Sequence, residues 1–159
     1  DKIEIKQVIE DSNQSVHVDY PFYLLLSERE SKDTNDSSII SYFTYDHLTY
    51  LFMGDASKQI EKQLMATYDL KADVIKVGHH GSNTSSDPDF LDSLDCKVAL
   101  ISCGYKNKYG HPSVETLKTL ENLHINTLCT SDCGSIAIYS LFHFSFVVTN
   151  DGMFGIIWT

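Results

Sequence analysis

Basic residues are scarce in this chain. It has 12 lysine and arginine residues against 22 aspartate and glutamate residues, so its 159 residues carry a formal net charge of −10. Tight sequence-independent binding of nucleic acid needs clustered basic residues, so the acidic balance argues against it, although a nuclease that uses metal ions is not excluded. The chain also lacks a secretory signal and any apolar run of about 18 residues or more, so we expect no membrane-spanning segment.

Cysteine and proline are scarce as well. Four cysteines are too few and too irregularly spaced for a disulfide framework, and the pair Cys129 and Cys133 misses the usual zinc spacing, so we expect buried thiols. The chain has three prolines and contains no repeat or low-complexity tract. The length and the 42% hydrophobic fraction predict one domain over residues 1–159. Because the chain begins with Asp1 rather than methionine, we expect a piece of a longer protein.

The order of secondary-structure signals predicts an α/β fold. β-branched and aromatic runs predict strands at residues 3–9, 22–26, 38–45, 48–53, 74–77, 97–102, 125–130, 136–139, 142–149 and 153–158. Helices are predicted behind Ser57, Asp87 and Ser113. Their inward faces are Ile60, Leu64, Met65 and Tyr68, then Phe90, Leu91 and Leu94, then Val114, Leu117, Leu120 and Leu123.

Strand and helix alternate after residue 38, which is the signature of βαβ units in a parallel sheet. The polar stretch at residues 27–38 is predicted to be an exposed loop. The turn sequence Asn150-Asp151-Gly152 predicts a hairpin in the tail. We therefore expect one mixed sheet with an antiparallel C-terminal margin.

Three predicted strands are followed by residues that carry chemistry. Asp55 follows the strand at 48–53, His79 and His80 stand between glycines after the strand at 74–77, and His111 lies after the strand at 97–102. Ligands gather at the carboxyl ends of strands in α/β sheets, so these side chains are expected at one edge. Carboxylate and imidazole bind zinc and manganese ions, so the pattern is typical of a metal hydrolase. The alternatives are that Asp55 caps a helix and that His111 begins one.

A loop at residues 104–110 lies beside this expected edge. Its lysines and tyrosines suit a phosphate and a stacked base or sugar, so Lys106, Asn107 and Lys108 are candidate substrate-binding residues. An ordinary polar loop is the alternative. The other histidines, His17, His47, His124 and His143, are expected to be structural.

The run at residues 72–86, Ala-Asp-Val-Ile-Lys-Val-Gly-His-His-Gly-Ser-Asn-Thr-Ser-Ser, and the Tyr-Gly-His-Pro at 109–112 closely resemble the metallo-β-lactamase-like domain of the ComEC family. The resemblance extends from Asn-Asp-Ser-Ser at 35–38, through Leu-Phe-Met-Gly-Asp at 51–55, to residues 130–136. That family forms the membrane channel for DNA uptake in natural competence. The resemblance implies an αββα fold with two divalent metal ions, zinc or manganese, and hydrolysis of the DNA strand that is not imported.

The resemblance also implies roles for individual residues. By position, Asp55 resembles the carboxylate that bridges the metals, and His80 resembles a metal ligand. His79, Ser82 and His111 resemble the catalytic groups that hold or protonate the phosphate. The implied partners are single-stranded or duplex DNA and the remainder of the channel protein. The implied location is the cell membrane, to whose outer side the domain would be attached.

One family motif has no counterpart. Nothing in residues 1–54 reproduces H-x-H-x-D-H, so we expect this chain to be the C-terminal part of the domain, with a partial αββα fold. A catalytic zinc ion normally has about three protein ligands, so the chain alone is expected to bind metal weakly or not at all and to be inactive. Two alternatives stay open, namely a non-catalytic module that docks DNA or the channel, and a metallo-hydrolase that acts on choline phosphate esters.

Overall fold

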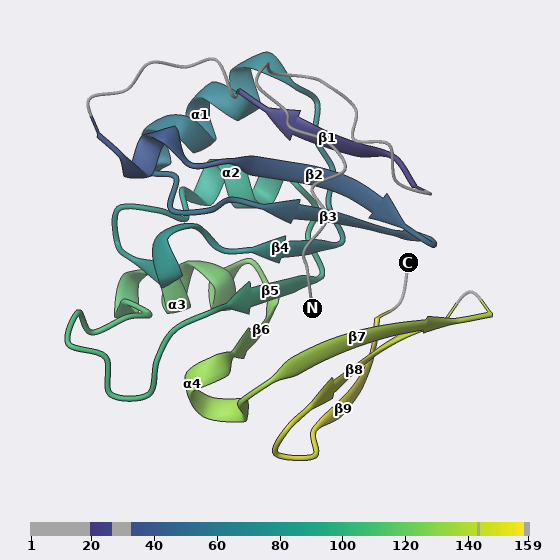
Figure 1. Cartoon of the computed structure of the whole chain (residues 1–159). Coiled ribbons are helices and arrows are strands. Elements are labelled where there is room, and N and C mark those ends of the chain that lie inside the picture. Colours follow the sequence, from purple (N-terminus) through teal and green to yellow (C-terminus); the bar gives the residue numbers. More distant parts are fainter. Residues whose placement is uncertain (1–19, 27–32, 143, 158–159) are drawn as a thin grey trace, which may run out of the picture.

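A six-stranded mixed sheet forms the centre of the fold (Figure 1). The computed structural model describes residues 20–26, 33–142 and 144–157. The strands are β1 (Phe22–Leu25), β2 (Ile40–Tyr45), β3 (Leu48–Phe52), β4 (Val74–Lys76), β5 (Val98–Ile101) and β6 (Asn126–Cys129), in this spatial order. β1 to β3 are antiparallel and β3 to β6 are parallel. The predicted α/β class and βαβ units are confirmed. The strand predicted at 3–9 and residues His17 and His143 lie outside the described residues.

The parallel strands are connected through helices. α1 (Lys58–Thr67) joins β3 to β4, α2 (Pro88–Ser93) joins β4 to β5, and α3 (Val114–Asn122) joins β5 to β6. Side chains of Asp87 and Ser113 cap α2 and α3, as their sequence predicts, whereas Ser57 precedes α1 without a side-chain cap bond. No helix within the described ranges has the length and apolar character needed to cross a membrane.

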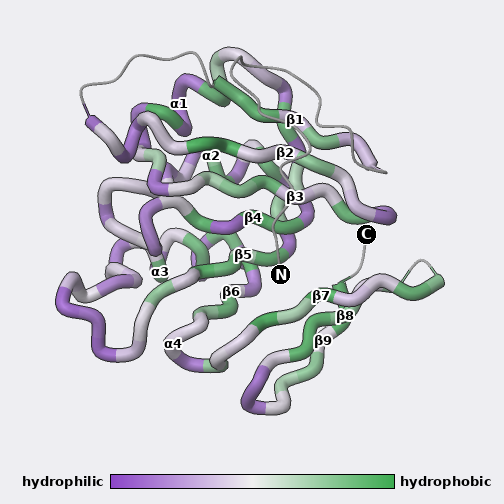
Figure 2. Tube along the Cα trace, viewed as in Figure 1, coloured by the Kyte–Doolittle hydropathy of each residue, from purple (hydrophilic) through white to green (hydrophobic). Residues whose placement is uncertain are grey.

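The strands bury apolar side chains on both faces of the sheet, and Figure 2 shows hydrophobic residues along them. On the helix face, Leu51, Ile75 and Ala99 pack against Leu64 and Phe90. The opposite face is covered in part by a second sheet. A second hydrophobic core lies between the two sheets. The first sheet contributes Leu48, Tyr50, Val74 and Val98 to it, and the second sheet contributes Val147 and Ile157. The layers therefore run helices, six-stranded sheet, three-stranded sheet.

The tail was predicted wrongly as the margin of one mixed sheet. β7 (Ile136–Leu141), β8 (Phe144–Thr149) and β9 (Phe154–Ile157) form a separate antiparallel sheet. After β6 the chain enters the short helix α4 (Thr130–Cys133) and then Gly134, whose φ of 71° redirects it away from the sheet edge. The predicted hairpin at Asn150-Asp151-Gly152 does join β8 to β9. The antiparallel margin of the first sheet is instead formed by β1 and β2.

Several side chains lie differently from the helical pattern. Met65, Val114 and Leu117 were predicted to face the core but are exposed. Glu61 and Thr116 are buried instead, because loops at the sheet edge need hydrogen-bonding partners there. Asp36, predicted to lie in an exposed loop, is also buried and accepts a hydrogen bond from the Ser57 amide at 3.1 Å.

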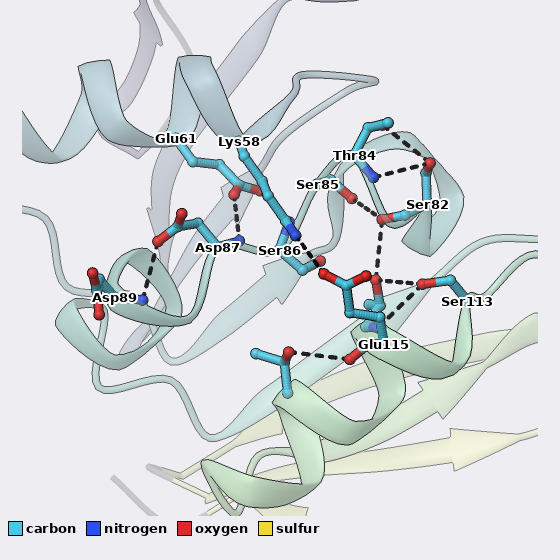
Figure 3. Close-up of polar contacts among 12 residues, drawn as sticks. Lys58, Glu61, Ser82, Thr84, Ser85, Ser86, Asp87, Asp89, Ser113 and Glu115 are labelled. Atoms are coloured by element: carbon cyan, nitrogen blue, oxygen red, sulfur yellow. Dashed lines mark hydrogen bonds and ion pairs between the residues drawn. The ribbon is translucent and has the colours of Figure 1, made fainter.

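Glu61 is the most buried carboxylate among the described residues, at 1% exposure. It accepts hydrogen bonds from the backbone amides of Ser86 at 2.8 Å and Asp87 at 2.7 Å, the second of which Figure 3 draws. Burial raises the pKa of Glu61 from 4.5 to about 7, although these two bonds and Lys58 oppose the shift. Glu61 thus fixes the start of α2 at an electrostatic cost.

The raised pKa of Glu61 predicts a pH-dependent stability. Between pH 4.5 and 7 the folded state holds the Glu61 proton more tightly than the unfolded state, so this contribution to stability falls as pH rises. We expect wild type to lose about 3 kcal/mol of unfolding free energy relative to Glu61→Gln across this window. Urea unfolding at several pH values measures the difference. The control Glu121→Gln changes an exposed carboxylate on α3 and should follow wild type; equal pH slopes for wild type and Glu61→Gln would contradict the prediction.

Gly54 lies in the left-handed region, with φ of 58°, directly against the loop before β2. A Cβ added to it would lie 2.6 Å from the Ser38 Cβ. Gly110 has a similar φ of 69° but open space around it. Urea titration should therefore show that Gly110→Ala costs about 1 kcal/mol of stability and Gly54→Ala about 3 kcal/mol. Equal losses of unfolding free energy for the two variants would contradict the prediction, because the contact of a new Cβ at position 54 with Ser38 would then cost nothing.

Candidate functional site

The loops that follow β3, β4 and β5 meet at one edge of the sheet, because these strands are parallel. The His79 amide donates a hydrogen bond to the Gly54 carbonyl at 3.1 Å, which ties the first loop to the second. The Ser113 amide donates to the Gly81 carbonyl at 2.8 Å, which ties the second to the third. A Cβ on Gly81 would lie 2.8 Å from the Pro112 Cβ, so only glycine permits this approach without a shift. The edge is thus a connected platform of three loops.

Asp55 and His80 face each other at this edge. The His80 Nε2 lies 3.6 Å from the Asp55 Oδ1, and both side chains are partly exposed. The His80 Nδ1 lies 2.6 Å from the Ser102 carbonyl oxygen, which can only accept, so Nδ1 carries a proton and donates it. Nε2 is therefore the nitrogen that remains for a second proton or a metal ion. This arrangement is the usual outer-shell support of a metal-binding histidine.

The separation of these two atoms fits shared coordination of one ion. With zinc bonds of about 2.0–2.2 Å to nitrogen and oxygen, two ligands of one tetrahedral ion lie about 3.4 Å apart. Within residues 20–26, 33–142 and 144–157, however, no group of three or more histidine, cysteine, aspartate or glutamate side chains is arranged to hold a metal. Asp55 and His80 therefore offer a pair of ligands rather than a complete set. Ser57, not Asp55, occupies the position directly before α1.

His79 and His111 complete a cluster of imidazoles. The His79 ring lies 5.7 Å from that of His111 and 6.4 Å from that of His80, measured between centroids. Burial lowers the pKa of His111, and the neighbouring His79 and His80 lower it further. Ser113 is the cap of α3, so His111 does not begin that helix. The structure therefore brings together all four residues that were predicted from the strand ends.

Ser82, by contrast, is not exposed with these histidines at the edge. It is buried, and its hydroxyl oxygen accepts hydrogen bonds from the Thr84 amide and the Thr84 hydroxyl (Figure 3). The Thr84 Oγ1 in turn lies 3.3 Å from the His79 Nδ1. In this arrangement Ser82 supports His79 through Thr84, and direct contact of Ser82 with a phosphate stays a prediction.

Sequence reasoning missed Lys76. Its ammonium donates to the carbonyl oxygens of Gly54 and Val77, both at 3.3 Å, and burial lowers its pKa while Asp55 opposes the shift. Lys76 thereby joins the ends of β3 and β4 beside Asp55. The available signal was a single lysine inside an otherwise apolar strand.

A cavity of about 470 Å³ opens beside His80, and its lining residues are His80, Ser102, Cys103, Gly104, Asn107, Tyr109 and His111. The Asn107 amide bonds to the carbonyls of Gly104 and His111 and accepts from the His111 amide, so it organises the loop. Contact of Asn107 with substrate stays a prediction. Lys106 and Lys108 are exposed, and their ammonium groups lie over the rings of Tyr105 and Tyr109.

The four cysteines are free thiols, as expected. Cys129 and Cys133 are buried, but Cys96 and Cys103 are only partly buried, so the expectation of four buried thiols is wrong for these two. Cys103 lines the cavity, where the sheet edge opens to solvent, and its sulfur lies 3.1 Å from that of Cys129.

No protein-family model matches the chain. Among curated proteins, it is 35% identical to ComE operon protein 3 of Bacillus subtilis over 120 residues, which is 74% of this chain and 16% of that protein. It is 34% identical to Competence protein ComA of Neisseria gonorrhoeae over 121 residues, 75% of this chain and 17% of that protein. Recombination protein 2 of Haemophilus influenzae is 33% identical over 88 residues, 55% of this chain and 11% of that protein. The chain thus spans about a sixth of the first two relatives, and its homologues include proteins named for competence.

Proposed function

We propose that this chain forms part of a metal-dependent phosphodiesterase in a ComEC-type DNA-uptake protein at the cell membrane. The observation that carries the proposal is the pairing of Asp55 and His80, with the His80 Nδ1 held by the Ser102 carbonyl. The homologues named for competence support DNA as the substrate. The strand that is not imported is the substrate that the sequence resemblance implies.

Asp55 and His80 are the residues that would hold a divalent cation, zinc or manganese. Such an ion polarises a phosphate ester and lowers the pKa of a bound water. A two-metal centre needs more ligands than this pair, and we propose that the H-x-H-x-D-H segment of the resembled domain supplies them. Lys76 keeps the Asp55 loop in place through the Gly54 carbonyl.

The remaining polar groups of the edge suit a phosphodiester. The lowered pKa of His111 favours its neutral form, whose ring N–H can hold a phosphate oxygen by a hydrogen bond. His79 is held beside it by Thr84 and is proposed to contact the phosphate. Lys106 and Lys108 place two positive charges on the adjacent loop, which favours a polyanion such as DNA over a single choline phosphate ester.

We expect the chain alone to bind zinc or manganese with a dissociation constant above about 1 μM, because two protein ligands are fewer than the usual three or more. Asp55→Ala and His80→Ala should each weaken that binding by at least about tenfold, as measured by titration calorimetry.

The matched control is His124→Ala, which removes an exposed histidine at the end of α3 and should leave the metal affinity unchanged. If His124→Ala lowers metal affinity as much as His80→Ala does, the metal is held by scattered histidines and the proposed site is wrong. Sub-micromolar, stoichiometric binding would show instead that the chain carries a complete site.

The two lysines of the loop at 104–110 predict a salt-dependent affinity for single-stranded DNA. Each phosphate contact on a single strand contributes about 0.7 to the slope of log affinity against log salt. The double variant Lys106→Ala, Lys108→Ala should therefore weaken binding and flatten this slope by about 1.4, as measured by fluorescence anisotropy of a labelled oligonucleotide.

The double variant Lys97→Ala, Lys118→Ala removes the same charge from positions outside this loop and provides the control. It should leave the slope close to that of wild type. Equal slopes for both double variants would remove the loop at 104–110 from the DNA site.

A further inference from the structure

Tyr109 has an unusual position on the loop between β5 and α3. Its side chain is 70% exposed, yet it lines the cavity beside His80 and His111. Its ring is stacked on the His111 ring, with centroids 5.9 Å apart and planes inclined by 17°. This is an offset parallel stack within the usual distance range for aromatic pairs. A flat aromatic surface therefore stands at the mouth of the cavity.

Hydrogen bonds within the loop hold the backbone that carries the stacked Tyr109 and His111. The Asn107 side chain donates to the His111 carbonyl at 2.6 Å and accepts from the His111 amide at 2.9 Å. The Gly110 amide donates to the Asn107 carbonyl, which closes the turn that carries Tyr109. The Ser113 amide then ties the end of the loop to Gly81. These bonds fix the backbone that carries both rings, and the stack of Tyr109 on His111 then presents a preorganised surface to a planar ligand.

Tyr105 on the same loop provides an internal comparison. It is 75% exposed and has Lys106 over its ring at 5.2 Å, much as Tyr109 has Lys108 at 4.9 Å. Within the described residues, however, Tyr105 is stacked on no second ring and does not line the cavity. The two tyrosines thus match in exposure and charge environment but differ in support.

We propose that Tyr109, stacked on His111, is a platform that takes one unpaired nucleobase of the substrate strand, while Lys108 binds the adjacent phosphate. This inference rests on the proposed function and specifies its substrate as a nucleic acid with an accessible base. A base within a duplex has both faces covered by its neighbours, so only an unpaired or extruded base can lie on the ring.

Lys108 does not block the platform. An exposed cation–π contact is worth about two- to fivefold in an equilibrium constant, whereas stacking of a base on an aromatic side chain is worth about fivefold to a hundredfold or more. The base therefore displaces the exposed ammonium, which is released toward the phosphate beside the base. The same lysine then contributes to the salt dependence of binding.

The test compares two oligomers of equal length and charge in EDTA at low salt, an oligothymidylate and an oligomer of abasic deoxyribose phosphates. Tyr109→Ala should weaken binding of the oligothymidylate by at least about fivefold and leave binding of the abasic oligomer unchanged. Tyr109→Phe should retain wild-type affinity for both. Tyr105→Ala, the matched control, should weaken both equally or neither.

The outcomes separate this inference from the function on which it rests. If wild type binds both oligomers with equal affinity, or if Tyr109→Ala weakens both equally, the platform is overturned while a phosphate-binding loop survives. If wild type binds neither oligomer, DNA as the substrate fails as well. Because EDTA removes divalent ions, failure of the Asp55 and His80 metal site leaves the result unchanged. Duplex DNA of the same sequence should show no loss on Tyr109→Ala, and a loss equal to that for the single strand would contradict the requirement for an unpaired base.

Discussion

Hydrogen bonds between loops hold together the strand ends that carry Asp55, His79, His80 and His111. The parallel register aligns Tyr50, Val74 and Val98 across three strands, so the strands end together. Alignment alone would leave three independent loops at that edge. The bonds from the His79 amide to Gly54 and from the Ser113 amide to Gly81 join them. The Ser102 carbonyl holds the His80 ring, whose Nε2 lies 3.6 Å from the Asp55 Oδ1. The site is therefore a property of the edge rather than of any single motif.

Buried carboxylates stabilise these loops at a cost. Glu61 and Asp36 accept hydrogen bonds from backbone amides that would otherwise lack partners near the starts of α2 and α1. An unsatisfied buried amide costs about 1–3 kcal/mol, which is comparable with the desolvation that raises the pKa of Glu61. Neither buried carboxylate improves the packing of the core, since an apolar side chain of similar size would fill the same space without a charge. What the carboxylates provide is a fixed path for the loops that flank the edge.

Hydrophobic periodicity was enough to predict most of the fold, because it records which face of each element is covered. It predicted β3 to β6 and their helices, but it does not record which sheet a strand joins, so the tail at β7 to β9 was placed wrongly. The meeting of Asp55 with His80 was predictable from the general rule for strand ends. The roles of Lys76 and Thr84 were not, because their partners, the Gly54 carbonyl and the His79 ring, are set by tertiary structure.

The two adjacent histidines occupy a turn whose backbone is strained. His79 and His80 both have left-handed dihedrals, with φ of 46° and 56°. For a non-glycine residue this costs about 1–2 kcal/mol each, and glycine would adopt the same turn without that cost. Packing does not compensate, because both rings are partly exposed at the sheet edge. A turn that keeps two histidines at strained backbone positions beside Asp55, where glycine would relieve the strain, supports the proposal that this edge binds a ligand.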